Sequence, residues 1–124
     1  MIERLSIDAL KKIIEGRFDN TATCIIKFYA NDCHYCHTLR DYYEDLSKDY
    51  TDEENLHFFA FNIQDDTSME ARIGFSGVPS IIAVKNAEKK LSIQKLQDPT
   101  KPNKFTWFHV NDIKNFIKEI TNDQ

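Results

Sequence analysis

An apolar run that leads directly into two closely spaced cysteines constrains this sequence most. Residues 24–30 are rich in β-branched and aromatic side chains, so a buried strand is predicted over residues 23–29. The segment Cys33-His34-Tyr35-Cys36 follows at once. Two thiols at this spacing can close a disulfide across one helical turn, which makes a two-electron redox switch.

A helix is predicted directly after this strand. Beyond Cys36, large side chains recur at intervals of three and four residues, as a one-sided helix requires: Leu39, Tyr42, Tyr43 and Leu46. Cys33 then lies at the helix N-terminus, where unpaired N–H groups and the helix dipole favour a thiolate and lower the pKa of the cysteine. Cys36, one turn further along, is expected to be more buried and less reactive.

A Cys-x-x-Cys pair also occurs in metal and haem sites. Cys33, Cys36 and His37 satisfy the pattern by which haem is attached through two cysteines, with the histidine as iron ligand. The same residues could hold zinc, but a structural zinc site needs a fourth ligand. The remaining candidates belong to no second paired motif, namely Cys24, His57 and His109. We therefore expect no metal here, and we expect Cys24 to be a buried, inert packing residue.

A second block of sequence distinguishes between these possibilities. Residues 72–88 have the pattern of a helix end, a glycine turn, a proline, an apolar strand and a charged turn. Together the two blocks resemble the thioredoxin family, in which a Phe-Tyr-Ala-like strand end precedes the CxxC motif and a Gly-Val-Pro-Thr-like segment opens a later strand. The corresponding segments here are Phe28-Tyr29-Ala30 and Gly77-Val78-Pro79-Ser80, in the family's order.

The resemblance implies a thioredoxin fold and a thiol–disulfide oxidoreductase that reduces protein disulfides. Cys33 would attack the substrate and Cys36 would resolve the mixed disulfide, so that the Cys33–Cys36 bridge is the redox group and no cofactor is needed. Pro79 would be a cis proline beside these cysteines, because the cis X-Pro bond costs only about 0.5 to 1 kcal/mol. The backbone of Val78 would then pair with an extended substrate segment.

Further contacts and a second partner are also implied. His34 and Tyr35, between the cysteines, are expected to contact the substrate. A separate reductase would regenerate the dithiol, and the protein is expected to act as a monomer.

Several positions depart from the family pattern and are expected to tune the redox potential. Lys27 stands where a buried acid assists proton transfer to the second thiol. Asp32 replaces the usual Trp and should disfavour the Cys33 thiolate, whereas a cationic His34 or His37 should favour it. These effects oppose each other, so the sequence leaves open whether the protein is a reductase, an oxidase or an isomerase.

Two related alternatives remain. Glutaredoxins share a CxxC motif and a Val-Pro segment, but the Gly-Gly turn that binds glutathione in that family has no counterpart after Ser80. A non-catalytic thioredoxin-like binding module is disfavoured because both cysteines are present. The segment 96–108 is longer than the turn found in the family, and we expect its Trp107 and Phe108 to pack in the core rather than face partners.

Length and charge fit one domain over residues 1–124. The formal net charge of −4 disfavours nucleic-acid binding, and no apolar run reaches the roughly 18 to 20 residues of a membrane span. The N-terminal residues resemble no targeting segment, so a cytoplasmic location is expected. Helices are predicted over 5–17, 65–72 and 111–121, with further strands over 57–63, after Pro79 and over 91–95. This order predicts an α/β fold, a mixed central sheet flanked by helices with an N-terminal helix.

Overall fold

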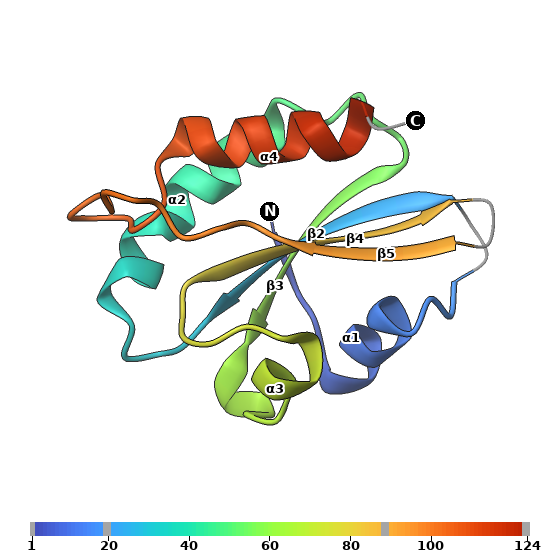
Figure 1. The fold of residues 1–124 in the computed structure, drawn as a ribbon, viewed down its shortest axis with the longest axis horizontal. Helices are drawn as coiled ribbons and strands as arrows, with labels where there is room; N and C mark the ends of the chain where they lie inside the picture. Colours follow the sequence, from blue (N-terminus) through green and yellow to red (C-terminus); the bar gives the residue numbers. More distant parts are fainter. Residues whose placement is uncertain (1, 19–20, 88–89, 123–124) are drawn as a thin grey trace.

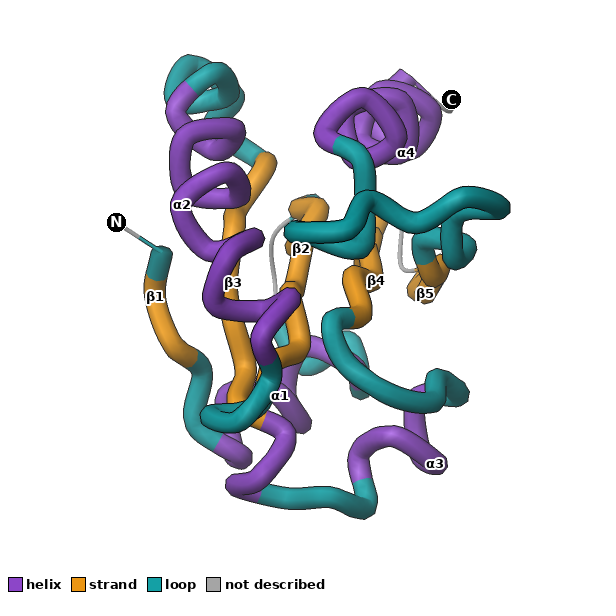
Figure 2. Tube along the Cα trace, turned by 90° about the vertical axis from the view of Figure 1, so that its left-hand side faces the viewer, coloured by secondary structure: helices purple, strands orange, loops and turns teal. Residues whose placement is uncertain are grey.

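The apolar run before the cysteines forms the middle strand of a five-stranded mixed sheet in a computed structural model, which describes residues 2–18, 21–87 and 90–122. The sheet order is β1-β3-β2-β4-β5, which Figure 2 shows from left to right. β2 is parallel to β3, and β3 to β1, whereas β4 is antiparallel to both of its neighbours. The strands span Glu3–Arg4 (β1), Ala22–Tyr29 (β2), Leu56–Asn62 (β3), Ser80–Ala87 (β4) and Lys90–Lys95 (β5).

Helices cover both faces of this sheet (Figure 1). Two lie on one face, α1 (Ile7–Ile14) and α3 (Met69–Ile73), and two on the other, α2 (His34–Lys48) and α4 (Val110–Asn122). The alternation of side chains along a strand explains the two cores. Ile26 and Phe28 of β2 pack in the core under α1 and α3, while Ile25 packs in the core under α2 and α4. The predicted mixed sheet between helices is confirmed.

The N-terminal helix is shorter than predicted. The backbone N–H of Leu5 donates to the carbonyl of Ala60 on β3, which keeps Leu5 extended beside β1. The helix therefore starts after Ser6, whose hydroxyl caps it by accepting a hydrogen bond from the N–H of Ala9 at 3.1 Å. Gly16 follows its end in a left-handed conformation with φ of 69°.

The strand predicted over residues 57–63 ends earlier, because Ile63–Asp65 form a 3-10 helix, η1. The apolar sequence of this strand predicts burial on both sides, and this is wrong at His57, which is exposed. The reason is the shortness of β1, whose two residues pair only with Phe59 and Ala60. The charged turn predicted at the end of β4 continues the strand to Ala87, and Glu88 lies outside the described residues.

One residue of the predicted apolar stripe on α2 is exposed in the structure. The buried side chains of this helix are Cys36, Leu39, Tyr43 and Leu46. Tyr42 is 52% exposed, because it lies about 100° around the helix from its buried neighbour Tyr43. The hydroxyl of Tyr43 lies 3.0 Å from the carbonyl oxygen of Ile25 and 2.9 Å from that of Phe59, to which it donates. This contact fixes α2 over the junction between β2 and β3.

Candidate active site

The two cysteines of the CxxC segment form a disulfide at the start of α2, with their Cα atoms 5.2 Å apart. Cys33 is the N-cap of the helix, and its Sγ accepts a hydrogen bond from the backbone N–H of Cys36 at 3.1 Å. Cys33 is half-buried, whereas Cys36 is only 3% exposed. Once the bond is reduced, the same N–H and the helix dipole favour a thiolate on Cys33. The arrangement leaves one accessible sulfur and one sheltered sulfur.

The loop before the disulfide is held by amide side chains. The backbone N–H of Asn31 donates to Oε1 of Gln64 at 2.8 Å, and the side-chain amide of Asn62 donates to Oδ1 of Asn31 at 2.9 Å. The carbonyl of Asn31 accepts from Nε2 of His37, 2.6 Å away. A carbonyl only accepts, so this ring nitrogen carries the proton.

Sequence reasoning missed these positioning residues. The available signal was the position of these residues near the ends of two predicted strands. In the structure, Tyr29 and Asn62 are register partners at the adjacent carboxyl ends of these parallel strands. The haem pattern would use His37 as an iron ligand, but here its Nε2 is bound to a carbonyl and the sulfurs are bound to each other. The geometry therefore favours thiol–disulfide chemistry.

The Val78–Pro79 peptide bond is cis. Val78 and Pro79 line a cavity of about 240 Å³ with Tyr35, which lies between the two cysteines. The turn before the proline is fixed, because the N–H of Gly77 donates to Oε2 of Glu70 at 2.7 Å and its carbonyl accepts from Oγ of Ser80 at 2.8 Å. The fold thus brings the second sequence block to the CxxC loop.

The other residue between the cysteines is placed differently. His34 is exposed, with its ring centroid 6.1 Å from that of Tyr35. It does not line the cavity that contains Tyr35 and Pro79. Asp32, also exposed, lies in the loop before Cys33. Both side chains therefore face solvent, on either side of Cys33 in the chain.

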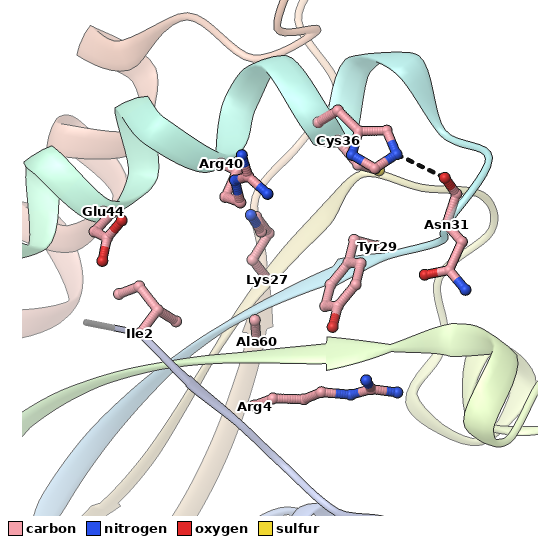
Figure 3. Close-up of a pocket in the computed structure, with 10 residues that line it drawn as sticks. Ile2, Arg4, Lys27, Tyr29, Asn31, Cys36, Arg40, Glu44 and Ala60 are labelled. Atoms are coloured by element: carbon pink, nitrogen blue, oxygen red, sulfur yellow. Dashed lines mark hydrogen bonds between the residues drawn. The ribbon is translucent and has the colours of Figure 1, made fainter.

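A second cavity, of about 350 Å³, lies on the α2 side of the sheet (Figure 3). Lys27 and Cys36 both line it, together with residues from β1, β2, β3, α2 and the connecting segments: Ile2, Arg4, Tyr29, Asn31, His37, Arg40, Glu44 and Ala60. Figure 3 shows the ammonium group of Lys27 pointing from β2 toward α2. The cavity therefore joins the sheltered cysteine to a buried cation.

Lys27 is 4% exposed, and its Nζ lies 5.1 Å from the ring centroid of Tyr43 and 5.8 Å from that of Tyr29. The pKa of Lys27 is lowered from 10.5 to about 8, first by burial and then by the positive charge of Arg40. The carboxylates of Asp41 and Glu44 act in the opposite direction. Because this pKa still lies above 7, the lysine is mostly charged at neutral pH.

The third cysteine and the C-terminal aromatic pair also have defined places. Cys24 is buried in β2, and burial raises the pKa of its thiol to about 11, as expected for an inert residue. Phe108 is in the core as predicted. Trp107 is half-buried and packs against the same core, and it also lines the cavity of Val78 and Pro79. Asp98, which lines it too, had no signal in the sequence.

Neither a metal centre nor a membrane-spanning helix is found among the residues that the structure describes. Within residues 2–18, 21–87 and 90–122, no three His, Cys, Asp or Glu side chains are grouped so that they could hold a metal ion. Over the same residues, no helix has the length and apolar character needed to cross a membrane.

Several known proteins are similar to this chain in sequence or in fold. Thioredoxin of Borreliella burgdorferi is 31% identical over 85 residues, which cover 68% of this chain and 71% of that protein. Among solved structures, the Trx4 domain of ERdj5 aligns with a TM-score of 0.74 at 13% identity, covering 99% of this chain and 97% of that one.

Two further structures are similar. Thioredoxin f2, solved in complex with ferredoxin:thioredoxin reductase, aligns with a TM-score of 0.71 at 16% identity over 98% of this chain and 96% of that chain. The J-Trx1 fragment of ERdj5 aligns with a TM-score of 0.70 at 16% identity over 98% of this chain, which spans only 50% of that fragment. These likenesses establish the thioredoxin fold. The thioredoxin family profile matches residues 6–106, and the chain belongs to the thioredoxin family.

Proposed function

We propose that this chain reduces disulfide bonds in protein substrates by thiol–disulfide exchange at Cys33 and Cys36. The observation that carries the proposal is the unequal placement of the two sulfurs, with Cys33 half-buried as the helix N-cap and Cys36 buried one turn behind it. Membership of the thioredoxin family supports the same chemistry.

The proposed reaction has two steps. The Cys33 thiolate attacks one sulfur of the substrate disulfide, forms a mixed disulfide and releases the other substrate sulfur as a thiolate, which takes up a proton. Cys36 then loses its proton and attacks Cys33, which releases the second substrate thiolate. Two electrons have passed to the substrate, and the Cys33–Cys36 disulfide remains.

Lys27 is the residue that we expect to assist the second step. Its buried ammonium group lines the same cavity as Cys36 and favours the thiolate form of that residue. Asp32 and His34 are exposed and hence screened, so Lys27 is the stronger determinant of the redox potential. His37 contributes by holding Asn31 and the loop before Cys33.

Substrate and regenerating partner approach the disulfide from outside. Pro79 and Val78 position an extended substrate segment next to Tyr35, with which they share a cavity. A reductase must return two electrons to the Cys33–Cys36 disulfide after each cycle. Thioredoxin f2, which shares this fold, was solved in complex with such a reductase.

Replacing each cysteine in turn tests the proposal. Cys33→Ser should abolish reduction of a protein disulfide, whereas Cys36→Ser should trap a covalent mixed disulfide between Cys33 and the substrate, seen by mass spectrometry and released by dithiothreitol. Cys24→Ala is the matched control, because Cys24 is buried away from the reaction; it should retain activity. An active Cys33→Ser variant, or a Cys36→Ser variant that traps nothing, would contradict the mechanism.

A further inference from the structure

The cavity beside the disulfide has a wall that comes from the C-terminal segment before α4. Tyr35, from the CxxC segment, forms one side, and Ser76, Gly77, Val78 and Pro79 form another. The remaining side consists of Asp98 and Trp107. Figure 1 shows this segment, in orange, passing the start of α2. Residues far apart in the sequence thus enclose one space next to the reacting sulfurs.

Trp107 is held in place on this wall. Its ring packs edge-on against Tyr35 with the centroids 5.5 Å apart, and its Nε1 donates a hydrogen bond to Oδ1 of Asp98 at 3.1 Å. The indole therefore has its polar atom satisfied by its own segment. Its apolar ring remains available to line the cavity.

The backbone around Trp107 is also constrained. Trp107 has a φ of 66°, in the left-handed region that is unfavourable for a bulky residue. Asn103 supports this conformation, since its N–H donates to the carbonyl of Trp107 at 2.9 Å and its carbonyl accepts from the N–H of Trp107 at 3.0 Å. Its side chain accepts hydrogen bonds from the N–H groups of Phe105 and Thr106. Strain of this kind persists only where the surroundings hold it, and it is often found at binding sites.

The dimensions of the cavity indicate what it can accept. At about 240 Å³ it is smaller than the roughly 300 Å³ at which sites for whole small molecules begin. The space suits one large side chain. Two aromatic rings on its walls, Tyr35 and Trp107, favour an apolar or aromatic occupant through ring packing and burial.

We propose that this cavity receives an apolar or aromatic side chain that neighbours the cysteine in the substrate, and that Trp107 sets this preference. The inference rests on the proposed function, because the occupant is part of the protein whose disulfide Cys33 attacks. Tyr35, which lies between the two cysteines in the chain, lines this cavity, so its occupant would lie within a few residues of the substrate cysteine. The substrate class is thus a protein disulfide flanked by a large apolar residue.

A single-turnover experiment tests the preference. The probes are peptides whose cysteine is disulfide-bonded to thionitrobenzoate, with Phe placed in turn at the two positions on each side of the cysteine and Gly in the reference peptide. In the Cys36→Ser protein, Cys33 displaces yellow thionitrobenzoate and retains the peptide. The best Phe peptide should react about tenfold faster than the Gly peptide, the ratio expected for about 1.4 kcal/mol of side-chain packing.

Variants of the C-terminal segment assign the effect to Trp107. In Trp107→Ala the ratio of the two rates should fall to about two or less, since one aromatic wall is lost. Trp107→Phe should retain most of it. Phe105→Ala is the matched control, because Phe105 lies in the same segment, is 65% exposed and does not line this cavity. Circular dichroism checks that each variant is folded, and Trp107→Phe provides the test if Trp107→Ala is not.

The outcomes separate this inference from the proposed function. Failure of Cys33 to react with any peptide, or with the small disulfide 5,5′-dithiobis(2-nitrobenzoate), overturns the proposed function. Equal rates for all peptides overturn only the cavity preference, and a preference that persists in Trp107→Ala overturns the role of Trp107. The chain has a single Trp, so a bound Phe peptide should also shift its emission, which a bound Gly peptide should leave near that of the free protein.

Discussion

At the scale of residues, the site is distinguished by the buried ammonium group of Lys27. Lys27 is protonated at neutral pH because its pKa of about 8 lies above 7, and it loses its charge as the pH rises through that value. Its neighbour in the cavity, Cys36, changes charge during the reaction. Two properties therefore depend on Lys27, the redox potential and the stability, and they depend on pH in ways that can be worked out.

The redox potential should respond to removal of this cation. Lys27→Met should make the Cys33–Cys36 potential more negative at pH 7, by up to about 30 mV, because the thiolate of the reduced pair loses a stabilising charge; 30 mV is the equivalent of one pKa unit on the thiol that is ionised. The shift should shrink above pH 9, where Lys27 is neutral in the native protein. Lys48→Met removes an exposed charge at the C-terminal end of α2 and should leave the potential unchanged. A less negative potential in Lys27→Met would contradict this role.

The same substitution should stabilise the protein. Burying the ammonium group costs free energy that methionine does not, so Lys27→Met should raise the free energy of unfolding by about 2 kcal/mol at pH 6.5. The folded pKa of about 8 lies below the unfolded value of 10.5, so between these values the unfolded chain binds more protons and the native protein gains stability as pH rises. The advantage of Lys27→Met should therefore diminish by pH 9.5. Urea unfolding at both pH values measures it, and a larger advantage at pH 9.5 would refute the assignment.

The sequence predicted single residues better than their surroundings. Cys33 and Pro79 could be located because they belong to the CxxC and Val-Pro motifs, and Lys27 could be located by its distance from the CxxC motif. The cavity around Lys27 could not be predicted, because Arg4 and Arg40 reach it from separate elements. Trp107 was expected in the core; it packs against the core under α2 and α4, but it is only half-buried and also lines the cavity beside Pro79. A hydrophobicity pattern carries no signal for this second contact.

At the scale of elements, α2 is the part of the fold that most directly positions the site. Its N-terminus holds both cysteines, and its middle is anchored by the hydroxyl of Tyr43 to the carbonyls of Ile25 and Phe59. The helix is therefore tied to β2 and β3 at the level where Lys27 also lies over the ring of Tyr43. A single buried side chain links the helix, the two central strands and the cation.

Removing that hydroxyl tests the link. Tyr43→Phe should lower the free energy of unfolding by about 1 to 2 kcal/mol, because a buried hydrogen bond is lost without a substitute. Tyr42→Phe makes the same change at the adjacent exposed position and should stay within about 0.5 kcal/mol of the native protein. Chemical denaturation of the two variants gives the comparison; equal effects would show that the Tyr43 hydroxyl does not anchor the helix.

The elements were predictable where the pattern of burial is regular. β2 and α4 differ from their predicted ranges by at most one residue at each end, because their apolar side chains recur with a clear period. β1 has only two residues, too few for any periodicity, and its pairing with β3 removes Leu5 from the predicted first helix. Ile63 continued the apolar run of β3 but begins η1. Short elements are set by long-range pairing, which a single sequence does not reveal.

The whole molecule has two hydrophobic cores that share one sheet. β2 contributes Ile26 and Phe28 to one core and Ile25 to the other, and β4 contributes Ile82 and Ile81 in the same way. Neither core can be dismantled without exposing the strands that support the other. We therefore propose that the chain is a single folding domain.

Unfolding should accordingly be one cooperative transition. Far-UV circular dichroism reports on all helices, whereas the emission of the single Trp reports on the segment beside the active site. The two signals should give the same midpoint and the same slope in urea, for the oxidised and for the reduced protein. An earlier fluorescence transition would show that the segment around Trp107 unfolds separately, which would contradict the single domain.

The measurement that tests the central claim most directly is the equilibrium redox titration of Cys33 and Cys36 in dithiothreitol buffers, with free thiols alkylated and counted by mass spectrometry. A protein-disulfide reductase should show one two-electron couple near the value of thioredoxin, about −270 mV. A couple above about −200 mV would indicate oxidase or isomerase chemistry instead. The absence of any couple between these two cysteines would contradict the account altogether.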